Sequence, residues 1–161
     1  MASVQDVKEV ILFEDLPDDF LERLLPLVEE QSMDERQIIY EPGSESDHFY
    51  SLKRGKVLLE SELAPNFIIS IGAIKPGYSF GWSALFLPNA PHTSYAVCSE
   101  PSEVLVFSGQ ELTAFLGRER ETGYTVMKRA ARILENRLER RTAQFLKVIG
   151  KHPEIGMLLG M

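Results

Sequence analysis

The sequence has 161 residues, a formal net charge of −7 and a single cysteine, and 44% of its residues are hydrophobic. This length fits one domain with a substantial core, and the single Cys98 excludes an internal disulfide and suits a reducing compartment. No apolar run approaches the roughly 20 residues of a membrane span, and the first residues lack the order of a signal peptide. We therefore expect a cytoplasmic protein without a membrane segment.

The charge is divided unevenly along the chain. Residues 1–117 hold 7 Lys and Arg against 19 Asp and Glu, whereas residues 118–161 hold 10 against 5. An acidic body argues against nucleic acid as the main partner. For the basic C-terminal part we favour a solvated helix face, and whether it meets an acidic partner stays open.

Two short helices are expected within residues 1–28. Residues 4–13 carry apolar side chains at helical spacing. Pro17-Asp18-Asp19 predicts the start of a second helix, because proline is tolerated in a first turn and carboxylates favour the positive end of the helix dipole. Phe20, Leu21, Leu24 and Leu25 form its apolar face.

Between residues 29 and 107 the pattern is that of short strands. Six runs rich in β-branched or aromatic residues are separated by turn residues such as Pro42-Gly43 and Pro76-Gly77. The runs are residues 37–40, 49–52, 56–59, 67–71, 95–98 and 104–107. Strands at this spacing predict a sandwich or jelly roll with protected edges.

Two further helices are expected within residues 108–150. Ser108-Gly-Gln-Glu111 has the capping-box spacing of a helix start, and a long helix follows over about residues 119–149, before Gly150 and Pro153. Its apolar stripe advances by steps of three and four and is broken only at Arg141: Tyr124, Met127, Ala131, Leu134, Leu138, Phe145 and Val148. Such a stripe favours pairing with a second copy. We expect the apolar tail, residues 151–161, to fold back onto the protein or a partner chain.

The stretch 78–94 has the features of an anion site. A glycine turn leads into a short apolar run, and backbone N–H groups at such a helix start lack internal partners. The stretch resembles the phosphate-binding cassette of cyclic-nucleotide-binding domains, which reads Phe-Gly-Glu-Leu/Ile-Ala-Leu, a short loop, then Arg-Thr/Ser-Ala. The matching residues are Phe80, Gly81, Ala84 and Leu85.

The resemblance extends beyond the cassette. Ile38-Ile-Tyr-Glu-Pro-Gly43, Asp47-His-Phe-Tyr50 and Leu52-Lys-Arg-Gly-Lys-Val57 are similar to the first strands of the same domains, so about residues 11–149 are covered. The resemblance implies an α+β fold. Its centre is a β-roll (a double-stranded β-helix or jelly roll) over residues 29–107, with N-terminal helices and a long C-terminal helix, all in a single domain spanning residues 1–161.

Two cassette positions depart from the family. Trp82 stands where the family has a ribose-binding Glu, and His92 stands where it has a phosphate-binding Arg. Trp82 either stacks another ligand in a reshaped pocket or fills the pocket itself. His92 is either a pH-dependent anion contact or a surface histidine.

The candidate binding residues follow from the cassette and the long helix. There is no Lys or Arg between Lys75 and Arg118, so polar groups of the cassette would have to hold an anion. Arg137, aligned with a functional position on the long helix of the family's catabolite activators, either supplies the missing cation or is an exposed or dimer-interface residue. The full set is Phe80, Gly81, Trp82, Ser83, Ala84, His92, Thr93, Ser94 and Arg137.

No enzyme or metal signature is present, because the three histidines are scattered and neither a Gly-x-Ser-x-Gly motif nor a P-loop occurs. The resemblance implies a regulatory module, not an enzyme, that binds a cyclic nucleotide weakly or another small anion. We expect it to signal through its C-terminal helix as a homodimer, with an unidentified protein partner and no DNA-binding domain. Two alternatives remain: an interaction module with a vestigial pocket filled by Trp82, and haem or metal sensing through His92.

Overall fold

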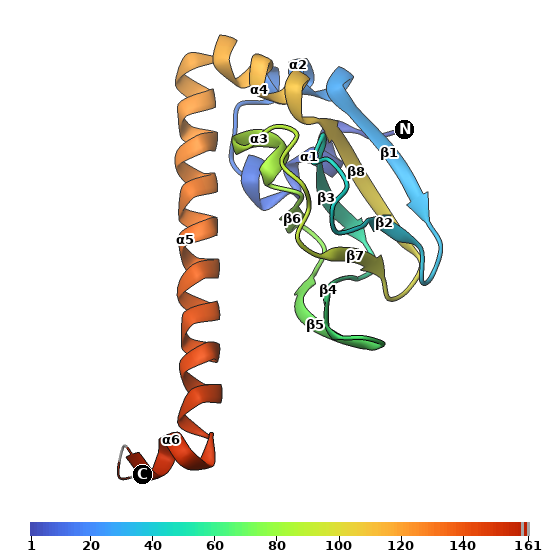
Figure 1. Ribbon diagram of the computed structural model, residues 1–161. Helices are drawn as coiled ribbons and strands as arrows, with labels where there is room; N and C mark the ends of the chain where they lie inside the picture. Colours follow the sequence, from blue (N-terminus) through green and yellow to red (C-terminus); the bar gives the residue numbers. More distant parts are fainter. Residues whose placement is uncertain (159, 161) are drawn as a thin grey trace. The chain divides into compact units, whose positions relative to one another are not determined.

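The computed structural model describes residues 1–158 and 160 (Figure 1). Two compact units make up the chain, Met1–Gly123 and Tyr124–Met161. The first contains all the strands and the short N-terminal helices, and the second contains most of the long helix. The sequence-based expectation of a single domain over residues 1–161 stays a prediction.

The N-terminal segment is more broken than the sequence pattern predicts. Residues 4–13 form α1 (Val4–Lys8) and a 3-10 turn, η1 (Ile11–Phe13), instead of one helix. The reason is that Val10 adopts an extended ψ of 121°, and the N–H of Ile11 donates to the Gly77 carbonyl 2.9 Å away. The second predicted helix is α2 (Asp18–Leu24), followed by η2 (Leu25–Leu27).

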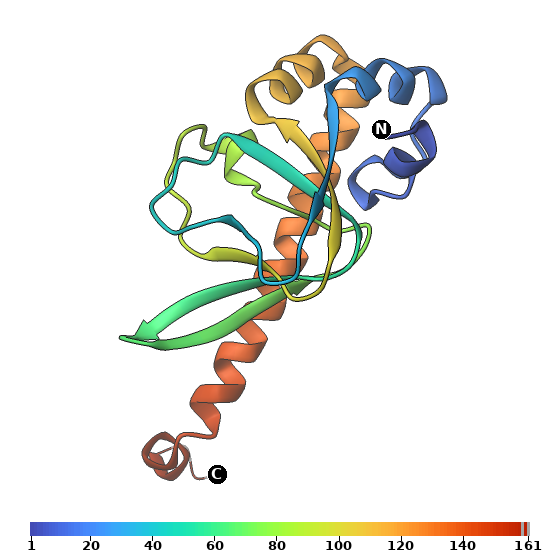
Figure 2. The same cartoon turned by 90° about the vertical axis from the view of Figure 1, so that its right-hand side faces the viewer.

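Two four-stranded antiparallel sheets form the β-roll, in the orders β1-β8-β3-β6 and β2-β7-β4-β5 (Figure 2). Their strands are β1 (Val28–Met33), β2 (Ile38–Tyr40), β3 (His48–Arg54), β4 (Val57–Ala64), β5 (Phe67–Ile74), β6 (Ser79–Phe80), β7 (Tyr95–Cys98) and β8 (Ser102–Ser108). The predicted α+β fold with a β-roll and a long C-terminal helix is thereby confirmed.

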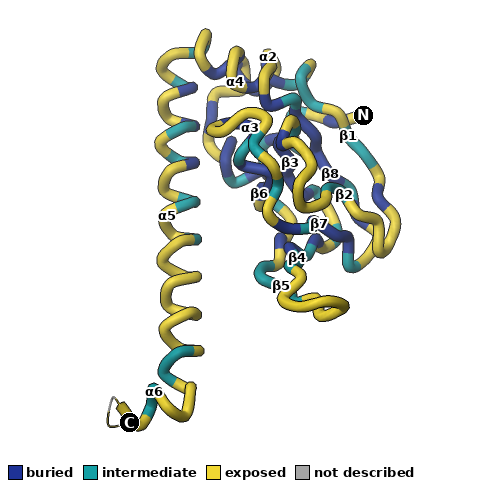
Figure 3. The backbone as a smooth tube through the Cα atoms, in the orientation of Figure 1, coloured by how far each residue is buried: buried dark blue, intermediate teal, exposed yellow. Residues whose placement is uncertain are grey.

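Strand β3 is buried on both faces, as Figure 3 shows for the centre of the roll. Tyr50 and Leu52 belong to the core inside the roll. Phe49, directly before Tyr50, contacts Phe107, whose ring lies 5.7 Å from that of Phe13 in η1. Because successive side chains of a strand point to opposite faces, Phe49 faces the N-terminal helices while Tyr50 faces the roll interior.

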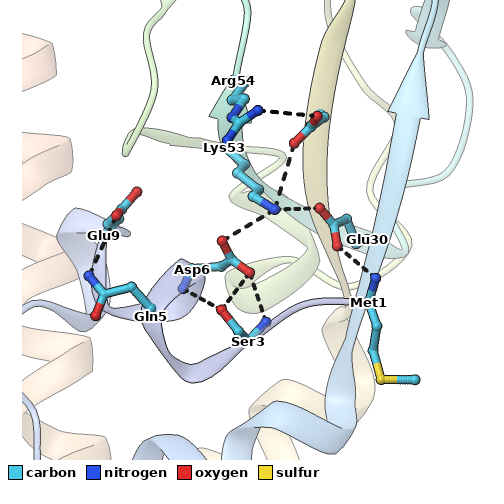
Figure 4. A network of polar contacts seen from close by, with 9 residues as sticks. Met1, Ser3, Gln5, Asp6, Glu9, Glu30, Lys53 and Arg54 are labelled. Carbon is cyan, nitrogen blue, oxygen red and sulfur yellow. Dashed lines mark hydrogen bonds and ion pairs between the residues drawn. The ribbon is translucent and has the colours of Figure 1, made fainter.

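A cluster of charged side chains fastens α1 to the first sheet (Figure 4). The Lys53 ammonium lies 2.5 Å from Glu30 and 3.2 Å from Asp6, with Glu103 at 3.6 Å. The hydrogen bond from Lys53 is the largest cause of a lowered pKa at Glu30, and Glu30 in turn raises the pKa of Lys53. These contacts join helix α1 to strands β1, β3 and β8.

After the roll come α4 (Gly109–Arg118), α5 (Arg120–Gly150) and α6 (Pro153–Leu158). The predicted cap of α4 is confirmed, because the Ser108 hydroxyl accepts a hydrogen bond from the Glu111 N–H at 3.3 Å. Across the described residues, no helix combines the length and apolar character needed to cross a membrane. In the tail, Met157 and Leu158 are exposed, while Leu159 and Met161 lie outside the described residues, so its folding back stays a prediction.

Candidate functional site

Glycine 81 brings the cassette-like stretch against β3. Its φ of +74° is a conformation that glycine adopts without strain, and a Cβ at this position would lie 2.8 Å from the His48 carbonyl oxygen. The same Cβ would lie 2.9 Å from Cδ2 of Tyr50. Strand β6 ends just before this residue, and the four-residue helix α3 (Ser83–Phe86) follows.

The Trp82 indole packs on the outer face of β3. Its ring lies edge-on to Phe49 with centroids 5.0 Å apart and parallel to Phe86 at 6.4 Å, and its Nε1–H donates to the Ser79 carbonyl at 3.2 Å. Since Phe49 and Tyr50 point to opposite faces of the strand, Trp82 lies away from the roll interior. This placement keeps the indole out of the roll interior, and which of the two alternatives for Trp82 holds stays a prediction.

Four other rings form a cluster beside the cassette, which we call the aromatic cluster: Tyr40, Tyr50, Phe80 and His92. Tyr50 stacks on Phe80 with 5.1 Å between centroids, and Tyr40 stacks on His92 at 3.6 Å. Tyr40 also lies 6.0 Å from Tyr50 and 6.2 Å from Phe80. Aromatic rings from β2, β3, β6 and the loop after α3 therefore occupy this end of the roll interior.

Backbone pairing holds His92 next to the loop between β2 and β3. The Gly43 N–H donates to the His92 carbonyl and the His92 N–H donates to the Ser44 carbonyl, both at 2.8 Å. The Ser46 N–H donates to the Ala90 carbonyl at 3.0 Å, and Glu45 forms an isolated bridge with Pro91. The cassette loop is thus anchored to a segment that lies more than 40 positions earlier in the sequence.

A groove of about 430 Å³ opens between the aromatic cluster and this loop. Its charged walls are the carboxylates of Glu41, Glu45 and Asp47. The remaining lining residues are Ile38, Ile39, Tyr40, Ser44, Tyr50 and His92. Within the described part of the chain, no Lys or Arg lines the groove, so its formal charge is negative.

Burial shifts the pKa values of His92 and Tyr50, two of the three ring residues that line the groove. It lowers the pKa of His92 below its usual 6.5, although the Asp47 carboxylate opposes that shift. Burial, with a smaller contribution from Asp47, raises the pKa of Tyr50 to about 12. His92 is therefore neutral at pH 7, and the pH-dependent anion contact that the sequence suggested would require a more acidic solution.

The predicted site residues do not all meet at the groove. His92 lines it, and Phe80 lies behind it in the aromatic cluster. Ala84 and Ser94 are buried, Ser83 is half-buried and Thr93 is exposed. Arg137 lies on α5, mostly in the second unit, so its part in ligand binding stays a prediction.

The acidic and tyrosine side chains of the groove were not among the site residues predicted from the sequence. Tyr40, Glu41 and Tyr50 stand inside the motifs that carried the family resemblance, but only as markers of strands. In the residues that the structure describes, no three His, Cys, Asp or Glu side chains are grouped closely enough to hold a metal ion. The groove is thus an aromatic and acidic surface without a metal-ligand geometry.

Comparison with known proteins supports the family suggested by the motifs. A family model described as "Cyclic nucleotide-binding domain" matches residues 30–119, more than half of the chain. No curated protein matches this sequence. The model match covers all eight strands except the first two residues of β1.

Several solved structures share the fold. A putative cyclic nucleotide-binding protein from Geobacter metallireducens is 25% identical, with a TM-score of 0.72, covering 86% of this chain and 99% of that one. The catabolite activator protein of Thermus thermophilus is 21% identical, with a TM-score of 0.71 over 85% of this chain and 62% of that one. The regulatory domain of Toxoplasma gondii PKA, solved with cAMP, is 15% identical, with a TM-score of 0.66 over 80% and 48% of the two chains.

Proposed function

The chain belongs to the cyclic nucleotide-binding domain family, and we propose that it is a regulatory ligand-sensing module that binds cyclic AMP and cyclic GMP weakly. The observation that carries this proposal is the composition of the groove. Three carboxylates line it, and the family's arginine position is held by His92, whose pKa is lowered by burial. A cyclic phosphate would meet negative charge where the family offers a cation.

The expected loss of affinity can be estimated from the two altered positions. The family's arginine donates charge-assisted hydrogen bonds to the phosphate, and a hydrogen bond to a charged group contributes roughly 1.5–3 kcal/mol. A neutral His92 offers a single N–H donor and no positive charge, so much of this contribution is lost. Trp82 provides no carboxylate for a ribose hydroxyl, which costs a similar amount. Together the two losses approach about three decades in the dissociation constant.

Titration calorimetry with cyclic AMP and cyclic GMP tests this proposal. We expect dissociation constants well above the micromolar range, or no measurable heat, at pH 7. Micromolar or tighter binding would contradict it, because the groove would then contain a phosphate contact that neither His92 nor its neighbours explains.

The proposed output of the module is a homodimer formed by the C-terminal helix. Within α5, the stripe residues Tyr124, Leu138, Phe145 and Val148 are all exposed. Their successive spacings of 14, 7 and 3 residues fit the seven-residue repeat of a coiled-coil seam. A ligand that favours one helix packing over another would then shift the dimer between two states. Sedimentation at micromolar concentration should give about twice the chain mass of 18.2 kDa, and a monomer would refute the dimer.

A second candidate function is a protein-interaction module with a vestigial pocket. The aromatic cluster favours it, because the Tyr50–Phe80 and Tyr40–His92 stacks occupy the end of the roll interior next to the cassette. An interaction module would dimerise like the sensor, but no small molecule would raise its melting temperature. A thermal-shift screen of nucleotides, small anions and small cations separates the two candidates.

A further inference from the structure

The groove combines two chemical features that the family's anion site does not require. The phenol ring of Tyr40 and the imidazole of His92 border it as a stacked pair, and Tyr50 lies beside them. Negative charge, of the same sign as that of a phosphate, is supplied by Glu41, Glu45 and Asp47. Aromatic faces and carboxylates in one cavity are the groups that bind positively charged organic ligands.

Two of these carboxylates are not neutralised within the protein. Asp47 interacts with the ring of its neighbour His48, at 2.7 Å from Nδ1. The carboxylates of Glu41 and Glu45, in contrast, have no hydrogen-bond or ion-pair partner among residues 1–158 and 160. A cation that enters the groove would meet unpaired negative charge and would not have to displace an existing partner.

The arrangement of the acidic groups favours an organic cation over a metal ion. The described residues contain no group of three His, Cys, Asp or Glu side chains arranged to hold a metal ion. An extended cation with its charge on an ammonium or guanidinium group needs no such convergence, because it can meet one carboxylate at a time and rest on a ring face. The volume of about 430 Å³ is also within the usual range for small-molecule sites.

We propose that this groove binds a small organic cation bearing an ammonium or guanidinium group, in place of a cyclic nucleotide. This assignment rests on the proposed function only in treating the groove as the effector site. It gives the module a ligand of the opposite charge to that of its family. The Tyr40–His92 stack and the Glu41 and Glu45 carboxylates are the contacts that would recognise it.

The test uses two probes of nearly the same shape and different charge, butylguanidinium and its neutral counterpart butylurea. Amide chemical shifts of the full chain would be followed by NMR at pH 7 and low salt. Butylguanidinium should give saturable shifts confined to residues around 40–47 and 92, and these should weaken as salt is added. Butylurea should give no comparable shifts.

A matched pair of double variants separates the groove from the general acidity of the protein. Glu41→Gln/Glu45→Gln should weaken butylguanidinium binding by roughly two- to tenfold, as expected for two solvent-accessible ion pairs. Glu22→Gln/Glu35→Gln removes the same charge from exposed positions outside the groove and should leave binding unchanged. Equal weakening in both variants, equal binding of butylurea, or no saturable shifts would each overturn the proposal.

Cyclic AMP in the same titration distinguishes this inference from the proposed function. Weak cyclic AMP binding together with no butylguanidinium binding would overturn the proposed cation site and leave the proposed function standing. Tight cyclic AMP binding defeats both, because the groove would then accept a phosphate despite its carboxylates.

Discussion

The imidazole of His92 stacks on the phenol ring of Tyr40, with 3.6 Å between centroids and 6° between ring planes. Backbone hydrogen bonds on both sides of His92, to Gly43 and Ser44, fix the ring in this position. A neutral stacked imidazole contributes packing but no positive charge. At the position where the resemblance places a phosphate-binding arginine, the structure thus has an aromatic contact within the protein.

We expect His92 to titrate below pH 6.5, because burial disfavours its charged form. The unfolded chain then takes up the proton at a higher pH than the folded chain does. The free energy of unfolding should accordingly fall as the pH drops from about 7 towards 5, through the His92 contribution. Urea unfolding across this range should show a smaller fall for His92→Gln. A ring pKa above 6.5 by NMR would contradict the expectation, and Asp47→Asn should lower that pKa further.

Removal of the Lys53 ammonium should destabilise the contact between α1 and the sheet. Lys53→Met leaves the Asp6 carboxylate without its ammonium partner and leaves Glu30 with only the N-terminal ammonium of Met1, 3.0 Å away, at a cost of about 1 kcal/mol for these partly exposed groups. Because Lys53 lowers the pKa of Glu30, it contributes stability above the unfolded pKa that is lost as the solution becomes acidic. Unfolding curves at pH 7 and pH 4 should therefore differ less for this variant than for the native chain. Lys56→Met, at an exposed lysine in the turn that follows β3, should leave both curves unchanged.

The stability of helix α4 depends on the side chain of its N-cap residue, Ser108. Ser108→Ala removes the acceptor for the Glu111 N–H and should lower the free energy of unfolding by roughly 0.5–2 kcal/mol. The urea midpoint should fall while the slope of the transition stays the same. Thr113→Ala, at an exposed position inside the same helix, should not lower the midpoint. Equal stability of the Ser108 variant and the native chain would show that water replaces the cap at no cost.

The strands could be predicted where burial imposes a pattern on the sequence. The six apolar runs correspond to β2, β3, β4, β5, β7 and β8. Strand β1 was missed because its sequence, Val-Glu-Glu-Gln-Ser-Met, is mostly polar and it lies at a sheet edge. Strand β6 was missed because it has only two residues.

The site was less accessible to sequence reasoning, for two physical reasons. Glu41 and Glu45 line the same groove as His92 because backbone hydrogen bonds join two loops that are distant in the sequence. The direction of the Trp82 side chain depends on the positive φ of Gly81 and on the packing of Phe49. Family motifs identify which residues occupy these positions, but not the face of β3 to which each side chain points.

If the apolar stripe of α5 forms the dimer interface, a charge introduced inside the stripe should break the dimer, and the same charge outside it should not. Leu138→Glu places a charge in the apolar seam and should convert the dimer to a monomer in sedimentation experiments. Leu146 is similarly exposed but stands outside the stripe, so Leu146→Glu should leave the dimer intact. Dissociation by both variants, or by neither, would place the interface elsewhere.

The final prediction restores a cation at the family's arginine position. His92→Arg should bind cyclic AMP roughly ten- to a hundredfold more tightly than the native chain, since a charge-assisted hydrogen bond contributes about 1.5–3 kcal/mol. The gain should be larger in His92→Arg/Glu45→Gln, because the second change removes a carboxylate from the same groove. His92→Gln is the matched control: it breaks the stack on Tyr40 without adding charge, and it should gain nothing. Calorimetry on the four proteins at pH 7 makes the comparison.

A gain in His92→Gln equal to that in His92→Arg would mean that the Tyr40–His92 stack blocks the ligand sterically. No gain in any variant would mean that cyclic nucleotides are excluded by the packed aromatic cluster and not by the missing charge.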